Sequence, residues 1–144
     1  MFDPAERAFL EAARVARLAT ADAEGRPHAV PVCFALDGDR VVSAVDEKPK
    51  DAEPDALRRV RDVRENPRVA LVADRYSEDW TELGWVQVRG TARVLNPGDP
   101  GHASAVRALR DRYDQYAVHD LEDRPVLAVD VGHVVSWGRL DPVA

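Results

Sequence analysis

The 144-residue sequence has one cysteine, Cys33. A single cysteine excludes an intrachain disulfide, and no group of cysteines and histidines has the spacing of a zinc site. No apolar run approaches the roughly 20 residues that span a bilayer. Because the N-terminus also lacks a basic segment followed by an apolar one, we expect a cytoplasmic protein without a membrane partner. Cys33 has no evident activating partner in the sequence, and we expect it to be a buried small apolar residue.

Positive charge is in deficit: 20 lysines and arginines face 26 acidic residues, giving a formal net charge of −6. Nucleic-acid binding usually needs a broadly basic face, so the balance argues against DNA or RNA as a partner. The sequence also lacks a recognisable catalytic triad, metal site or paired carboxylates. If the protein is an enzyme, we therefore expect a bound cofactor to carry the chemistry, with no catalytic side chain and no metal.

The chain is long enough for one domain over residues 1–144, and it shows no repeat or linker. The expected elements are a helix over 4–16, strands over 17–21, 26–36 and 41–45, a loop over 46–56, a helix from 57 that ends before Asn66, strands over 69–74 and 84–95, a helix over 102–116, and a strand over 126–137. Strands that follow one another with short helices at the corners favour a mainly β fold. We expect a six-stranded antiparallel barrel with short flanking helices.

Two short patterns locate particular turns. Asp3, Pro4 and Glu6 have the positions of an N-cap, a first helical residue and the third residue of a capping box. Asp37 and Gly38 form a dipeptide that is typical of a tight hairpin between antiparallel strands. These patterns predict where the first helix begins and where the strand after residue 40 pairs.

The acidic chain concentrates cations on one short segment, and this concentration indicates a local function. Five arginines fall within eleven residues, and two lysines lie just upstream: Arg58, Arg59, Arg61, Arg64, Arg68, Lys48 and Lys50. The guanidinium group offers parallel N–H donors that match phosphate and carboxylate oxygens. The segment therefore predicts an anion site. The alternative is a solvated helix face whose charges are balanced by Asp62 and Glu65.

The element order and four stretches of sequence resemble the split β-barrel flavin and deazaflavin oxidoreductases, the superfamily of pyridoxamine 5′-phosphate oxidase. The stretches are 14–20 with 25–32, 57–69, 76–80 through 85–92, and 133–138. The nearest resemblance is to the actinobacterial branch that uses the deazaflavin coenzyme F420. The resemblance implies a split barrel that forms a homodimer, with the cofactor in a groove between the two subunits.

The resemblance also implies roles for individual residues. The expected phosphate contacts are Lys50, Arg58, Arg59 and Arg61, with Lys48 as the alternative to Lys50. The expected ring contacts are Pro31, Val32, Ser43 and Val45. The residues expected to face the cofactor, some of them from the partner chain, are Leu83, Gly84, Trp85, Arg89 and Trp137. Each tryptophan, including Trp80, has the alternative role of a core or dimer-interface anchor.

The resulting hypothesis is an F420-dependent oxidoreductase that transfers a hydride from the reduced deazaflavin to an unknown small organic acceptor. One alternative stays within the fold: an oxidase or reductase that uses FMN. The other is of a different class: a protein that binds a flavin or a haem without turnover. The sequence does not identify the substrate, because variable loops shape the acceptor pocket in proteins of this kind.

Overall fold

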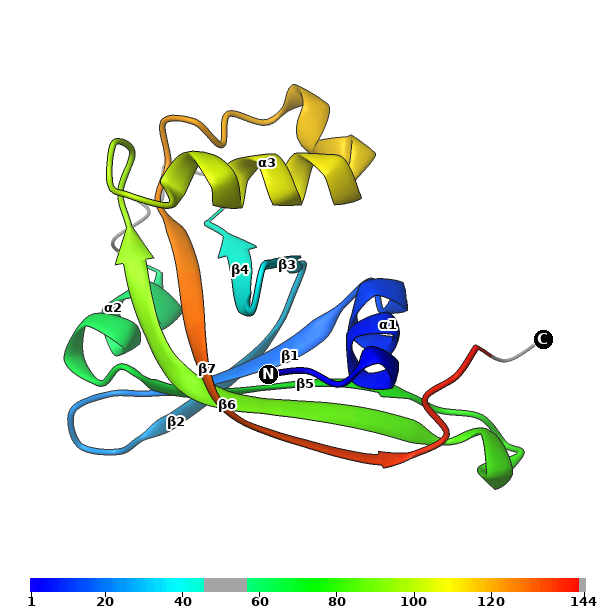
Figure 1. Ribbon diagram of the computed structural model, residues 1–144. Coiled ribbons are helices and arrows are strands. Elements are labelled where there is room, and N and C mark those ends of the chain that lie inside the picture. The colour runs from blue at the N-terminus through cyan, green and yellow to red at the C-terminus, as the bar shows by residue number, and fades with distance from the viewer. Residues whose placement is uncertain (46–56, 143–144) are drawn as a thin grey trace.

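The computed structural model of the protein describes residues 1–45 and 57–142 (Figure 1). The helices in these residues are α1 (Pro4–Ala12), α2 (Arg58–Glu65) and α3 (His102–Arg112), with the 3-10 turns η2 (Trp80–Glu82) and η3 (Asp114–Val118). The strands are β1 (Ala16–Ala21), β2 (Pro27–Val32), β3 (Ala35–Asp37), β4 (Arg40–Ala44), β5 (Arg68–Arg75), β6 (Gly84–Leu95) and β7 (Val126–Gly138). The predicted loop 46–56, with Lys48 and Lys50, lies outside the described residues.

The strands form one sheet in the order β2-β1-β5-β6-β7-β4-β3, and every pairing is antiparallel. β2 and β3 therefore lie at opposite edges of the sheet, although only Cys33 and Phe34 separate them in the chain. Two intervening residues bridge at most about 11 Å, so the sheet curls until its edges meet. This curled half-barrel confirms the mainly β antiparallel fold with short flanking helices that the sequence predicts.

The sheet has seven strands where the sequence predicts six. The single strand expected over residues 26–36 is interrupted at Cys33 and Phe34. The Tyr113 hydroxyl accepts from the Phe34 backbone N–H at 3.1 Å and lies 2.9 Å from the Phe34 carbonyl oxygen, while Ser43 Oγ donates to the Cys33 carbonyl oxygen. Side chains thus satisfy backbone groups that a continuous strand would pair with a neighbour.

Local patterns near the N-terminus are confirmed, whereas two helix ends are not. Asp3 caps α1, and Glu6 completes the capping box. The helix ends at Ala12 rather than at residue 16, because Ala16 already begins β1. Likewise α3 ends at Arg112, and the chain continues as the separate turn η3. Helical spacing alone reveals neither the start of the next strand nor the change to a 3-10 turn.

Two apolar cores lie on the two sides of the bend in the sheet. The larger one fills the barrel beneath α1 and α2 and includes Leu10, Phe34 and Leu71. The second lies under α3, over β3 and β4, and includes Val42 and Leu109. Figure 1 shows α3 over this second part of the sheet, while β6 and β7 bend together toward β5 and β1.

The bend in β6 and β7 coincides with a β-bulge. The pairing register shifts between Arg89, opposite His133, and Gly90, opposite Val131, which leaves Gly132 as the extra residue. A bulge of this kind bends the strand and increases its twist. Gly90 also approaches its neighbour closely, because a Cβ atom there would lie 2.1 Å from the carbonyl oxygen of Asp130.

We therefore predict that Gly90→Ala lowers the free energy of unfolding by about 1–3 kcal/mol, since the backbone of β7 has to move to admit the methyl group. Gly132→Ala is the matched control in the same bulge. Its Cβ would meet the Arg89 carbonyl oxygen at an ordinary 3.5 Å. Urea unfolding of both variants measures the difference. Equal stability of the two variants would contradict this account of the bend.

Candidate functional site

A hollow of about 170 Å³ opens at the seam of the barrel, which we define as Cys33 and Phe34 with the ends of β2 and β4 beside them. The residues that line it are Val15, Pro31, Val32, Cys33, Ser43, Ala44, Arg59 and Tyr116. Four of these belong to the set predicted from the sequence: Pro31, Val32, Ser43 and Arg59. The hollow exists because the two sheet edges meet here while α2 and η3 close its sides.

One hydrogen bond from a strand side chain joins two walls of the hollow. Ser43 Oγ donates to the Cys33 carbonyl oxygen at 2.8 Å and so joins β4 to the seam. Cys33 lines the hollow and is only partly buried, so the expectation that it is a buried small apolar residue is wrong. The seam places a thiol and a hydroxyl next to the valine and alanine side chains of the wall.

Arg59 supplies the one positive charge among the eight residues that line the hollow. It lies on α2 and is 9% exposed, far less than an ordinary surface arginine. A guanidinium in a partly dehydrated pocket attracts an anion more strongly than one in water, because the local dielectric constant is lower. Of the arginines in the cluster, Arg59 therefore has the environment of an anion-binding residue.

Arg58 and Arg61 lie on another side of α2. They line a second hollow together with Asp22, Glu24, Arg26, Asp62 and Glu65. Successive helical residues are separated by about 100°, so neighbours in the sequence point in different directions. The structure therefore does not bring Arg58 and Arg61 to the hollow that Arg59 lines, and the four acidic residues around them disfavour a free anion there.

One further predicted contact falls outside the hollow, and another falls outside the described residues. Val45 follows β4 but is completely buried in the larger core. Lys50 lies outside the described residues, as does its alternative Lys48. Their predicted roles are untested.

The remaining predicted residues gather on the far half of β6 and β7. Trp85 pairs with Trp137, Gly84 with Gly138, and Arg89 with His133 across the two strands, while Leu83 precedes β6. A row of cross-strand pairs leads from the hollow to β6. Pro31 pairs with Arg17, Arg17 pairs with Val72, and Val72 pairs with Gln87. At about 4.8 Å per strand, this row places the hollow roughly 14 Å from β6. Within one chain the two predicted groups thus lie about three strands apart and do not line one hollow.

Tyr116 is a lining residue that sequence reasoning missed. It is 5% exposed and lies in η3, more than seventy positions from the strands that it meets. Its ring packs edge-on against Tyr113 at 5.6 Å between centroids. Burial raises the pKa of Tyr113, so its hydroxyl stays protonated as a donor. Contacts that only the structure reveals connect this part of the chain to the seam: the Tyr113 hydroxyl contacts the Phe34 backbone, and the Arg112 guanidinium lies over the Phe34 ring.

The hollow has the chemistry of a binding site for a ligand with an anionic group and an apolar body. It combines one cation with a hydroxyl, a thiol, a phenol and small apolar walls. In residues 1–45 and 57–142, no group of three or more His, Cys, Asp and Glu side chains is arranged to hold a metal ion. Of the described helices, none is long and apolar enough to cross a membrane.

The sequence matches a protein-family model over residues 2–138, and that model describes pyridoxamine 5′-phosphate oxidase. The chain belongs to this family. The split barrel expected from the sequence is thereby confirmed, with its seam at Cys33 and Phe34. The match places both the hollow and the paired tryptophans inside the shared domain.

Similar proteins include enzymes and haem-binding proteins. A 5a,11a-dehydrotetracycline/5a,11a-dehydrooxytetracycline reductase of Streptomyces rimosus is 35% identical over 98 residues, or 67% of this chain and 66% of the reductase. A haem-binding protein of Mycobacterium smegmatis has a TM-score of 0.72 and 26% identity, over 96% of this chain and 55% of that one. HutZ, the haem storage protein of Vibrio cholerae, has a TM-score of 0.69 but 14% identity, over 90% and 89%. The chain thus matches just under two thirds of the reductase and about half of the mycobacterial protein.

We predict that Arg59→Glu weakens FMN binding by about 2–4 kcal/mol, because it replaces an attraction for the phosphate by a repulsion. Arg61→Glu makes the same charge change on the same helix but away from the hollow, and should alter affinity by less than about 1 kcal/mol. Fluorescence titration with FMN and with phosphate-free riboflavin measures both effects. Equal losses in the two variants would mean that Arg59 acts only through long-range charge.

Proposed function

We propose that the protein is an oxidoreductase that binds F420 and transfers a hydride from the reduced deazaflavin to a small organic acceptor. The observation that carries the proposal is the nearly buried Arg59 in the hollow at the seam, next to three of the four predicted ring contacts. A phosphate suits the guanidinium, and the apolar walls suit a planar ring. The similarity to a reductase of tetracycline intermediates supports a reductive role.

The residues at the hollow fit a function in which the cofactor supplies the chemistry. When bound, a reduced flavin or deazaflavin supplies the hydride. The protein's part is to hold the phosphate at Arg59, to shape the wall with Val32 and Ala44, and to exclude water with Tyr116. Ser43 donates its hydroxyl hydrogen to the Cys33 carbonyl oxygen, and none of the eight residues found to line the hollow is a His, Asp, Glu or Lys that could act as its base. Hydride transfer needs this positioning and no dedicated acid or base.

F420 is proposed over FMN because of the charge around α2. Both cofactors carry a phosphate, but F420 adds a lactyl and oligoglutamate tail whose charges require further cations. Arg64 and Arg68 are exposed on and beside α2, outside the acidic hollow that Arg61 lines, and they supply such charge near Arg59. An exposed cation contributes modestly to affinity, so several together are needed to select the longer anion.

A second function, binding of haem without turnover, is favoured by the similarity to the mycobacterial haem-binding protein over 96% of this chain. Haem requires an axial ligand from the protein or a partner. Tyr116 and Cys33 are the residues of ligand type that line the hollow, and no histidine does so. The seam thus fits a phosphate-bearing flavin better than a haem.

The cofactor choice gives a direct prediction. Purified protein titrated in parallel with F420, FMN and haemin should bind F420 most tightly, with a dissociation constant in the micromolar range or below, or roughly 8 kcal/mol. Raising the salt concentration should weaken F420 binding more than FMN binding, since more ion pairs are screened. Tighter binding of FMN would replace the cofactor within the same function, and tighter binding of haemin would favour the second function.

We further propose that the protein is a homodimer whose cofactor groove lies between the subunits. The outward face of β1, β5 and β6 carries small or apolar side chains that are partly exposed, among them Ala19, Ala70 and Val72. It continues into the Trp85–Trp137 pair, where Trp137 is 53% exposed. A partly apolar sheet face of this size favours association with a second copy through a two-fold interface. Such an interface would bring the tryptophans of one chain to the hollow of the other.

The shared site predicts complementation. Arg59→Glu and Trp137→Ala homodimers should each bind cofactor weakly. Co-expressed with different tags and purified as a heterodimer, the two variants should bind one cofactor per dimer at wild-type affinity, because one of the two sites keeps both residues. A heterodimer that carries both changes on one chain and none on the other is the matched control and should bind weakly at both sites. Cofactor-bound monomers in light scattering, or undiminished binding by Trp137→Ala alone, would contradict the shared site.

A further inference from the structure

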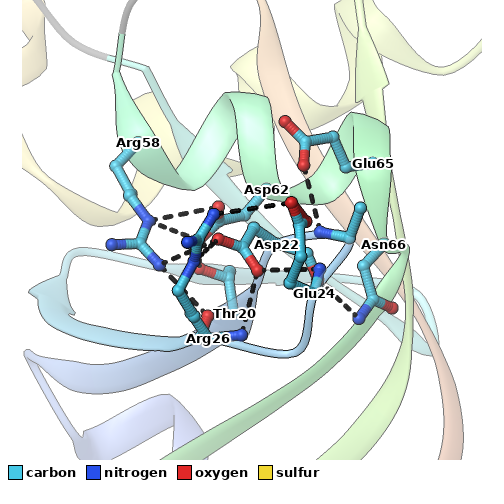
Figure 2. A network of polar contacts seen from close by, with 9 residues as sticks. Thr20, Asp22, Glu24, Arg26, Arg58, Asp62, Glu65 and Asn66 are labelled. Atoms are coloured by element: carbon cyan, nitrogen blue, oxygen red, sulfur yellow. Dashed lines mark hydrogen bonds and ion pairs between the residues drawn. The ribbon is translucent and has the colours of Figure 1, made fainter.

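The carboxylate of Asp62 is the most buried charge of α2. It is 2% exposed and points toward the β1–β2 hairpin. Thr20 Oγ1 donates to its Oδ2 atom at 2.7 Å, and Nε of Arg58 donates to both carboxylate oxygens at 3.2 Å (Figure 2). Thr20 is itself 3% exposed. A buried strand residue and a helical arginine thus hold this one carboxylate from two directions.

A second layer of contacts extends from Arg58 into the hairpin. Its Nη2 atom donates to the Arg26 carbonyl oxygen at 3.1 Å and lies 4.0 Å from the Asp22 carboxylate. Nε of Arg26 donates to Asp22 at 2.7 Å, and this hydrogen bond is the chief cause of the lowered pKa of Asp22. Figure 2 shows the four charged side chains packed together between α2 and the turn of the hairpin.

The network contributes little to the stability of the fold, but it restricts the orientation of α2. Removing a carboxylate and a guanidinium from water costs much of what their attraction returns. The apolar residues of α2, Val60 and Val63, already attach the helix to the core. Apolar contacts are not directional, whereas hydrogen bonds lose strength quickly as their angles change. The polar contacts therefore restrict the rotation of α2 about its axis.

The rotation of α2 decides where Arg59 points. Arg58 and Asp62 are four residues apart and share one face of the helix, which the hairpin holds. Arg59 follows at about 100° around the axis and reaches the hollow. The end of a side chain lies roughly 6 Å from a helix axis, so a rotation of about 20° would displace it by about 2 Å. A shift of this size is enough to break contact with a phosphate.

We propose that Asp62 is a positioning residue for the cofactor phosphate: with Thr20 and Arg58 it fixes the rotation of α2 that presents Arg59 to the hollow. The inference rests on the proposed function, because it needs a phosphate at Arg59. The N-cap of α2 strengthens the case. Leu57 makes no capping hydrogen bond with its side chain, so Arg58 is the first residue that anchors this end of the helix by a polar contact.

The test is a double-mutant cycle read with two ligands. The probe is whichever of F420 and FMN binds the wild-type protein more tightly, and its phosphate-free counterpart is the reference. Asp62→Asn keeps the shape of the side chain but removes its charge. It should weaken binding of the probe about tenfold or more and change binding of the reference less than twofold. In an Arg59→Gln background the same change should alter binding of the probe less than twofold, because the residue it positions is gone.

Three further variants complete the experiment. Thr20→Val removes the buried hydroxyl without touching a charge and should weaken the probe severalfold, whereas Thr20→Ser should keep wild-type affinity. Glu65→Gln is the matched control: its carboxylate is exposed on the same helix, accepts from the Ala23 N–H, and should leave affinity unchanged. Thr20→Val supplies the same cycle if Asp62→Asn does not fold.

Two outcomes overturn this inference alone: an equal loss for the phosphate-free reference, or a full loss that persists in the Arg59→Gln background. Either would mean that the network supports the fold and not the direction of Arg59. A third outcome, in which Arg59→Gln itself leaves the affinity of the probe unchanged, overturns the inference together with the phosphate site of the proposed function. The two failures are therefore distinguishable.

Discussion

The meeting of the two sheet edges is the constraint on which the rest of the structure depends. β2 and β3 lie at opposite ends of the strand order, yet two residues connect them. This short connection curls the sheet, and the Ser43 and Tyr113 hydroxyls bind the backbone where the strands separate. The hollow at the seam follows from this closure. Because closing the sheet forms the hollow, the hollow is present whenever the protein is folded.

The direction of one arginine illustrates how a fold selects among equivalent residues. Arg58, Arg59 and Arg61 are alike in the sequence, but the helix separates them by rotation. The hairpin accepts a hydrogen bond from Arg58 at the Arg26 carbonyl oxygen and holds Asp62 through Thr20, whereas Arg59 reaches the hollow. The charge proposed to bind the anion and the charge proposed to set its position are thus neighbours in the chain. A substitution at either one is expected to affect the anion site, but by different physical routes.

Much of the fold was predictable because its signals are local. The capping box at Asp3 and the hairpin at Asp37 and Gly38 each depend on a few consecutive residues. The break at Phe34 was not predictable, because its partner Tyr113 lies 79 positions away. The placement of Tyr116 in the hollow has the same cause. Long-range polar contacts leave no periodic trace in a sequence.

Part of the candidate site was predictable from the sequence, but the directions of some of its side chains were not. Pro31, Val32, Ser43 and Arg59 meet at the seam, and the family resemblance supplied them together. Val45 is one residue past the end of β4, and its side chain turns into the core instead. The direction of Arg58 depends on its partner Asp62. The arginine-rich pattern does not distinguish Asp62 from an ordinary surface acid. The family resemblance predicts the region of the site, whereas packing in this chain determines where each side chain points.

The most direct test of the central claim is a crystal structure of the protein with its tightest-binding flavin or deazaflavin. The account predicts the phosphate within hydrogen-bonding distance of the Arg59 guanidinium, with the ring against Pro31, Val32 and Ser43. A phosphate bound instead on the side of α2 where Arg58 and Arg61 lie, or a ring bound away from the seam, would contradict it.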